Sequence, residues 1–278
     1  MSSVTPRLAC TVRGCGLPLT LDDRRLVCAS GHSYDVARSG YVNLLQPHDR
    51  RSLDAGDPKD VVESRSRLIA AGVGRRLIET VAARISRHAH HDGQIADLGC
   101  GSGDALAAIA TAAPRSTGVG VDLSAAAVAH AARRYPALTW IVANADRVLP
   151  FPDASTGVVL SMHARRNPDE TRRVLESGGI LIVAVPAADD LIELRAAVQG
   201  QAVEHDRVDA LIAAHAPGFT LVERTTVTDR HRLEGALLRD LLRVTYRGQR
   251  RSEAPRAGAL DAMTVTLASD LVVFANAT

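Results

Sequence analysis

Lysine is almost absent from this chain of 278 residues, because Lys59 is the only one among 33 basic residues. The other basic side chains are arginines, which bind phosphate in a bidentate manner that lysine cannot match. Aromatic residues make up only 3% of the chain, which argues against an aromatic platform for stacking single-stranded nucleic acid. No run approaches about 18 uncharged apolar residues, so no membrane-spanning helix is expected.

The N-terminal sequence has no apolar segment typical of a secretory signal, so we expect a cytoplasmic protein with no membrane partner. The charge is mixed, with 31 acidic residues and a formal net charge of +2, and 46% of the residues are hydrophobic. This composition supports a buried core rather than extensive disorder. The length predicts one large or two modest domains.

Cysteine is also rare, and three of the four cysteines fall close to the N-terminus. A disulfide framework is not expected in a cytosolic chain. Together with one histidine, the early cysteines form two pairs of soft ligands on short turns, separated by a hairpin-length spacer: Cys10, Cys15, Cys28 and His32. This pattern predicts a closed, structural zinc site. The alternative is three buried cysteines and a chance histidine.

Three segments follow from the pattern along the chain: a zinc-binding module at residues 1–46, a linker with helices at 47–91, and an α/β domain at 92–278. Apolar residues between Val61 and Ala89 recur at helical spacing and are interrupted at Gly72 and Gly74, which predicts two helices.

In the third segment, short apolar runs alternate with helical stretches. The expected strands are Ile95–Leu98, Thr117–Asp122, Leu138–Ala143, Gly157–Met162 and Gly179–Val185. The expected helices are Asp104–Ala113, Ser124–Arg134, Pro168–Leu175 and Ala188–Gln199. This alternation predicts a doubly wound, Rossmann-like parallel sheet. Two strand-like runs around a helix near Glu234–Val244, namely Phe219–Asp229 and Met263–Ala275, are expected to add an antiparallel pair at the sheet edge.

A glycine-rich turn follows the first expected strand of this domain, in the segment that runs from Asp97 to Asp104. Its alternate glycines let the backbone approach a bound molecule, and Asp122 at the end of the next strand can accept both hydroxyls of a ribose. The spacing lacks the third glycine of dinucleotide-binding turns, which disfavours NAD. The turn also lacks the lysine of a phosphate-binding loop, which disfavours ATP.

The whole pattern resembles the class I S-adenosylmethionine-dependent methyltransferases. The segments DLGCGSGD, VGVDLS, NADRVLPFPDASTGVVLS and RRVLESGGILIVAVP are similar to successive motifs of that family. By this resemblance the glycine turn lines the methionine part of the cofactor, Asp122 holds its ribose, and residues 144–146 flank its adenine. The expected cofactor-binding residues are Asp97, Gly99, Gly101, Ser102, Gly103, Asp122, Leu123, Asn144, Ala145, Asp146 and Asp190. The chain departs from the family at Thr156-Gly157, usually Phe-Asp, and at Ser177, usually Pro.

The zinc pattern, GHSYDVARSGYVNLL, an Arg/Asp loop and a class I domain together resemble the RlmA family over essentially the full chain. The resemblance implies methylation of guanine N1 in a 23S rRNA hairpin, an RNA-recognition role for the zinc module, a homodimer, and kinship with macrolide-resistance enzymes. The chain departs from the family in the longer spacing between Cys10 and Cys15, and at Asp190 and Gly74, where the family has a histidine and an aromatic residue. The longer spacing bears on the geometry of the zinc site. The changes at Asp190 and Gly74, both near the cofactor by the resemblance, point to looser cofactor binding or to a different target nucleotide.

An RNA substrate agrees with the local charge. Eight arginines lie between residues 230 and 256, at positions 230, 232, 239, 243, 247, 250, 251 and 256, and Arg50 and Arg51 follow the zinc module. Local basic patches steer a protein onto phosphate even when its net charge is small. The alternative is a solvated helix face in an arginine-rich protein.

Neutral guanine carries a proton on N1, so a general base, or a group that stabilises the negative charge developing on O6, should help the transfer. The candidates are Asp146, Asp190 and His163, whose alternative roles are an adenine contact, a helix N-terminal charge and an ordinary loop residue. Cys100 is expected to be a packing residue. Two other functions stay open: a methyltransferase for a small biosynthetic substrate, which would not need the zinc module, and a binding protein without catalysis, which would not need the glycine turn.

Overall fold

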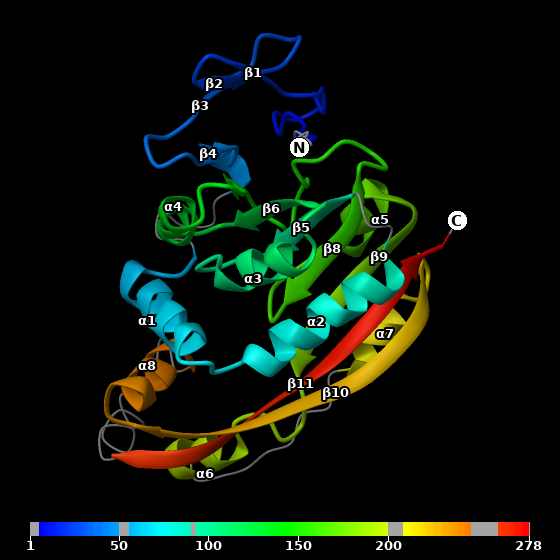
Figure 1. The fold of residues 1–278 in the computed structure, drawn as a ribbon. Helices are drawn as coiled ribbons and strands as arrows, with labels where there is room; N and C mark the ends of the chain where they lie inside the picture. Colours follow the sequence, from blue (N-terminus) through cyan, green and yellow to red (C-terminus); the bar gives the residue numbers. More distant parts are fainter. Residues whose placement is uncertain (1–5, 50–55, 90–92, 200–207, 246–260, 278) are drawn as a thin grey trace.

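The computed structural model describes residues 6–49, 56–89, 93–199, 208–245 and 261–277. A small N-terminal module lies at one end of a large twisted sheet flanked by helices (Figure 1). The α/β class and the separate N-terminal module are both as the sequence predicts.

The module contains a three-stranded antiparallel sheet made of β1 (Thr20–Asp22), β2 (Arg25–Val27) and β3 (Ser33–Asp35). The hairpin between the first two strands turns at Asp23, whose φ of 53° is left-handed. The chain then forms β4 (Val42–Asn43), which pairs in parallel with β7 as an outer strand of the large sheet. The module is therefore joined to the second domain through main-chain pairing.

The large sheet has eight strands in the order β10-β11-β9-β8-β5-β6-β7-β4. Its parallel part comprises β4 with β5 (Gln94–Leu98), β6 (Thr117–Asp122), β7 (Thr139–Val142), β8 (Thr156–Met162) and β9 (Leu175–Pro186). The strands β10 (Phe219–Glu234) and β11 (Ala262–Asn276) complete it as an antiparallel pair at the edge, as expected.

Helices cover both faces of this sheet, which confirms the doubly wound arrangement. One face packs against α2 (Arg75–His88), α3 (Asp104–Ala112) and α4 (Ala125–Arg134). The opposite face packs against α5 (Pro168–Val174), α7 (Val208–His215) and the zinc module. Ser124 caps α4 by accepting a hydrogen bond from Ala127, and Pro168 lies in the first turn of α5, each as predicted.

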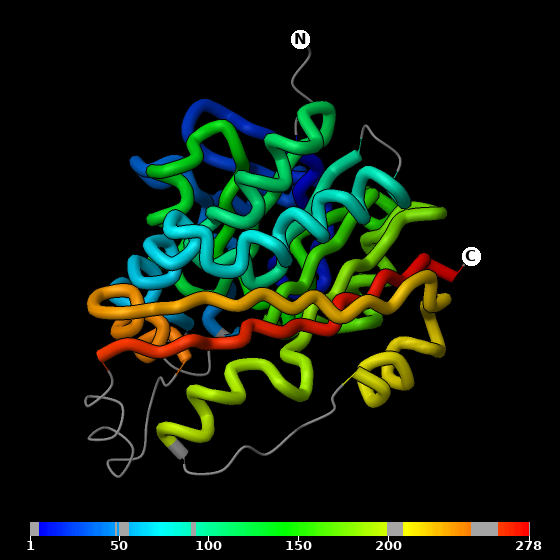
Figure 2. The backbone as a smooth tube through the Cα atoms, turned by 60° about the horizontal axis from the view of Figure 1, so that its bottom comes forward, coloured from blue at the N-terminus to red at the C-terminus, as the bar shows by residue number. Residues whose placement is uncertain are grey.

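The paired strands β10 and β11 run well past the other strands, side by side along the molecule (Figure 2). Their far end packs with α1 (Lys59–Ala70), α6 (Ile192–Gln199) and α8 (Gly235–Thr245) in a third apolar cluster. The 3-10 helix η1 (Pro47–Asp49) lies on the path from the module to α1. Within the described ranges, no helix is long and apolar enough to cross a membrane.

Two helices differ from the expectation. The predicted helix from Ala188 begins only at Ile192, because Leu191 has a left-handed φ of 52° and the Asp190 carboxylate bonds to β11 instead of capping a helix. The second is α7, which the sequence pattern did not predict.

Candidate functional site

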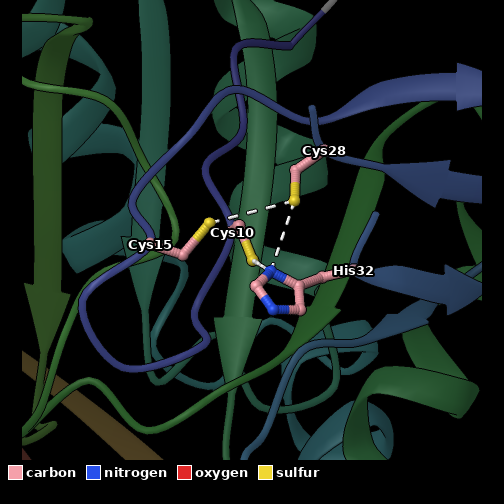
Figure 3. Close-up of side chains that lie close together, drawn as sticks. All are labelled: Cys10, Cys15, Cys28 and His32. Carbon is pink, nitrogen blue, oxygen red and sulfur yellow. Dashed lines mark hydrogen bonds between the residues drawn. The ribbon is translucent and has the colours of Figure 1, made fainter. Parts of the chain in front are cut away.

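The four predicted zinc ligands come together between β3 and the first turns of the module (Figure 3). Their ligand atoms all lie within 4.8 Å of one another. The Sγ atoms of Cys15 and Cys28 are 3.8 Å apart, and His32 Nδ1 is 3.4 Å from Cys28 Sγ and 3.5 Å from Cys10 Sγ. A tetrahedral zinc ion with ordinary bond lengths separates two sulfur ligands by about 3.8 Å, and sulfur from nitrogen by about 3.6 Å. The donor set therefore fits zinc, and the longer spacing of Cys10 and Cys15 does not prevent it.

Tight turns bring these ligands together. The Cys15 N–H donates to the Val12 carbonyl at 2.9 Å, and the Cys28 N–H donates to the His32 carbonyl at 3.1 Å. Burial raises the pKa of the Cys28 thiol, but nearby N–H groups and side chains outweigh burial and lower this pKa to about 7. A thiol that ionises near neutral pH is suited to binding a metal as thiolate.

The module also contacts the sheet beside the ligands. The Ala9 N–H donates to the Pro150 carbonyl at 2.9 Å, and Arg7 forms a 2.7 Å ion pair with Glu176. An open groove of about 780 Å³ lies between the zinc turns and the loop after β7, with Arg13, Arg147 and the exposed Val148 among its lining residues.

The predicted glycine turn leads from β5 into α3. Gly99, Gly101 and Gly103 have left-handed φ values of 77°, 54° and 80°. At Gly103 a Cβ would lie 2.6 Å from the Trp140 ring and 2.7 Å from Ala131 Cβ, so both conformation and space require glycine there. Ser102 is buried inside the turn. Cys100 is buried too, and burial raises its thiol pKa, in agreement with a packing role.

Two carboxylates lie behind the turn. Asp97 is only 1% exposed, and neither of its carboxylate oxygens has a hydrogen-bond partner among the residues that the structure describes. Burial, with a smaller contribution from the charge of Asp122, raises the Asp97 pKa to about 7. Asp122 accepts hydrogen bonds from the N–H of Gly101 at 2.9 Å and of Ser124 at 2.8 Å. A buried carboxylate without a partner is costly unless a ligand supplies a donor, so this end of the turn fits a molecule with an ammonium group.

Residues 144–146 follow β7 at the same edge of the sheet. Asn144 donates to the Asp49 carbonyl at 3.0 Å and accepts a hydrogen bond from the Asp146 N–H. The Asp146 carboxylate faces Arg165 at 3.3 Å. Leu123 and Ala145 are half-buried, which leaves part of each side chain open to a ligand.

In the part of the chain that the structure describes, Asp190 is held by β11 and not by the glycine turn. Its carboxylate accepts the Ala268 N–H of β11 at 2.9 Å, and burial raises its pKa to about 6. In the described residues no contact joins Asp190 to the glycine turn, so its place among the cofactor-binding residues stays a prediction.

Arg65 is a site residue that the sequence reading missed. It comes from α1, and its Nη1 lies 3.0 Å from where a Cβ on Gly101 would stand. It forms a 2.7 Å ion pair with Asp57, whose backbone carbonyl in turn accepts the Ser124 hydroxyl at 2.6 Å. Arg65 therefore brings a positive charge to the turn, where it can pair with a carboxylate of a ligand. To predict Arg65 as a site residue, a sequence pattern linking Asp57 and Arg65 to the glycine turn would have been needed.

Only some arginines of the predicted basic patch lie within the residues that the structure describes. Arg232 and Arg239 are exposed, whereas Arg243 bonds to Ser64 and Asp240 and lies 3.5 Å from Asp60. The arginines at 50, 51, 247, 250, 251 and 256 lie outside the described residues. Part of the predicted patch thus links α8 to α1 through hydrogen bonds and ion pairs of the exposed Arg243.

Comparisons with known proteins cover both parts of the chain. The family model described as "RlmA, N-terminal" matches residues 9–53, and a "Methyltransferase domain" model matches residues 95–179. The 23S rRNA (guanine(748)-N(1))-methyltransferase of Streptomyces fradiae is 36% identical over 222 residues, which cover 79% of this chain and 78% of that protein. A candidate 23S rRNA (guanine-N(1)-)-methyltransferase of Micromonospora griseorubida is 36% identical over 68% of each chain.

A solved structure of geranyl diphosphate methyltransferase in complex with SAM shares the fold, with a TM-score of 0.50 and 16% identity. The match covers 81% of this chain and 94% of that one.

Proposed function

Because this chain belongs to the RlmA-type family of 23S rRNA (guanine-N1)-methyltransferases, we propose that it methylates N1 of one guanine in a 23S rRNA hairpin. S-adenosylmethionine is the cofactor, and it supplies a methyl group already activated on a sulfonium. The observation that carries the proposal is the joining of a zinc-ligand cluster to the sheet that bears the glycine turn. A small-molecule methyltransferase needs the glycine turn but not the zinc-ligand cluster.

The residues of the turn fit the cofactor. The unpartnered Asp97 carboxylate matches its ammonium group, and Arg65 matches its carboxylate. Asp122 would accept the ribose hydroxyls, and residues 144–146 would border the adenine. The chain's contribution is to hold the two reactants in line, which can supply roughly 7–11 kcal/mol.

RNA recognition is assigned to the zinc module and the adjoining groove. Single-stranded loop bases are read by stacking and by hydrogen bonds once they are splayed out, and the groove offers both apolar surface and arginines at Arg13 and Arg147. Selectivity for a hairpin and a cytoplasmic location are predictions that go with an rRNA substrate. A homodimer and a role in resistance to ribosome-targeting antibiotics are further predictions, which light scattering and growth inhibition of expressing cells would test.

The test is methyl transfer from labelled S-adenosylmethionine to 23S rRNA that lacks its own modifications, followed by primer extension. A stop at one guanine supports N1 methylation, because N1 lies on the Watson–Crick edge. Label without a stop retains the RNA enzyme but moves the target atom. No label, while the cofactor binds in a calorimeter, favours the small-molecule alternative. An Asp122→Ala variant serves as the control for cofactor dependence.

A further inference from the structure

A histidine lies directly beside the glycine turn, on the loop that follows β8. His163 comes immediately after Met162, the last residue of that strand, at the edge where parallel sheets bind their ligands. The next residue, Ala164, packs so closely that a Cβ on Gly99 would lie 2.4 Å from Ala164 Cβ. The charge of Arg65, which lies against Gly101 of the same turn, also acts on the His163 ring. His163 therefore lies next to the glycine turn.

The backbone of this loop is strained and held in place. His163 has a left-handed φ of 55°, which non-glycine residues rarely adopt unless their surroundings enforce it. Its N–H donates to the Ala184 carbonyl at 2.9 Å, while the Ala164 carbonyl accepts hydrogen bonds from Ser161 at 3.2 Å and Arg166 at 3.1 Å. Such strain is often retained where a side chain must face a ligand.

The imidazole ring of His163 makes one hydrogen bond among the described residues, through Nε2. His163 Nε2 lies 2.9 Å from the hydroxyl oxygen of Ser269, a buried residue of β11. No other hydrogen bond to the ring is found within the described part of the chain. Desolvation of the ring, with a smaller contribution from the charge of Arg65, lowers its pKa to about 4. The imidazole is thus neutral at pH 7, and one of its ring nitrogens carries a lone pair.

We propose that His163 is the general base that removes the N1 proton of the target guanine, and that the contact with Ser269 orients its ring. This proposal rests on the proposed function. When Nε2–H donates to Ser269, Nδ1 keeps its lone pair. The guanine N1–H bond then breaks and the proton moves to Nδ1. The electron pair left on N1 forms the bond to the methyl carbon, while the methyl–sulfur bond breaks and its pair stays on sulfur.

The other two candidates are less suited. The Asp146 carboxylate pairs with Arg165, and the Asp190 carboxylate holds the Ala268 N–H. Each already has a partner that stabilises its negative charge or fixes its orientation. His163 alone of the three adjoins the glycine turn through its neighbouring residue.

The kinetic test compares His163→Ala and His163→Gln with His88→Ala, a control at the far end of α2 where His88 bonds to Glu223. We expect both His163 variants to lower kcat by about 10²–10⁴-fold, while the dissociation constants for S-adenosylmethionine and for the RNA stay within about twofold by calorimetry and filter binding. Added imidazole should restore part of the activity of His163→Ala. Unchanged kcat in both variants, or loss of RNA binding that accounts for the whole defect, would overturn the proposal.

A second measurement needs no turnover. Long-range ¹H–¹⁵N NMR of the cofactor-free protein should show the His163 proton on Nε2, and Ser269→Ala should change the ratio of the two tautomers. A proton on Nδ1 would contradict the proposal. If the unaltered protein labels no RNA, the proposed function fails instead, whatever the variants show.

Discussion

The zinc module and the large sheet are stabilised in opposite ways. Each strand of the module is three residues long, and β1 is exposed along its whole length. The central strand β5 of the sheet is buried at every residue. Few apolar side chains are buried among the module's own strands, so the metal ligands must replace a core there. The sheet needs no metal, but it has a carboxylate buried at its centre.

The largest expected effect comes from removing the zinc. Binding of a structural zinc contributes an apparent 10–16 kcal/mol, roughly, to folding of small modules, so a chelator or Cys28→Ser should unfold the module while the sheet persists. Hydrogen exchange should show loss of protection at β1–β3 and retained protection at β5, β6 and β8. Unfolding of both regions at the same chelator concentration would show that they are one cooperative unit.

The second-largest expected effect is that of pH, which should change the stability of the module and of the sheet in opposite directions. Thiolates bind zinc, so the module becomes more stable as pH rises. Asp97 has a pKa near 7 in the folded protein and about 3.9 when unfolded, so the native state binds the extra proton between these values. Stability of the cofactor-free sheet should therefore fall as pH rises from about 4 to about 7, by an amount on the order of 4 kcal/mol.

Urea denaturation of the sheet across this pH range measures the effect. Asp97→Asn should remove the larger part of the slope and leave the smaller part due to Asp190, whose pKa is raised by burial to about 6. Calorimetry in buffers of different ionisation enthalpy should also show proton release when S-adenosylmethionine binds below pH 7. A slope unchanged in Asp97→Asn would assign the titration to another group.

Two glycines with similar backbone geometry sharpen the comparison further. Gly14 in the module and Gly103 in the turn have φ values of 74° and 80°, but only Gly103 lacks room for a Cβ. Gly14→Ala should cost about 1 kcal/mol of folding free energy from backbone strain. Gly103→Ala should cost about 3–4 kcal/mol, because overlap with Trp140 is added. Equal losses in denaturation experiments would mean that the Trp140 side chain moves away freely.

The smallest expected effect is on cofactor affinity. Arg65→Ala should weaken S-adenosylmethionine binding about tenfold, or roughly 1.4 kcal/mol, and should leave the zinc content of the module unchanged. Arg76→Ala, at an exposed position on α2, provides the matched control. Equal affinities in the two variants would remove Arg65 from the cofactor site.

The sequence predicted those features whose residues are close along the chain. The zinc ligands sit on two short turns, and the glycine turn lies within a few residues of Asp97, so their spacing alone carries the chemistry. Arg65 escaped prediction because it reaches the turn only through the packing of α1, and Ser269 because it meets His163 only through the position of β11. The start of α6 was also misplaced, since the Asp190 contact that delays it is made with β11.

The pairing of β4 with β7 has a consequence for substrate choice. Only Val42 and Asn43 of β4 take part, yet they lie near the end of the zinc module, just before the linker to α1, so the module cannot swing independently of the sheet edge. An RNA loop seated against the module would stand at a fixed offset from the glycine turn. The protein would then act as a ruler, and the spacing between the gripped nucleotide and the target guanine, rather than the identity of the guanine's neighbours, would select the base.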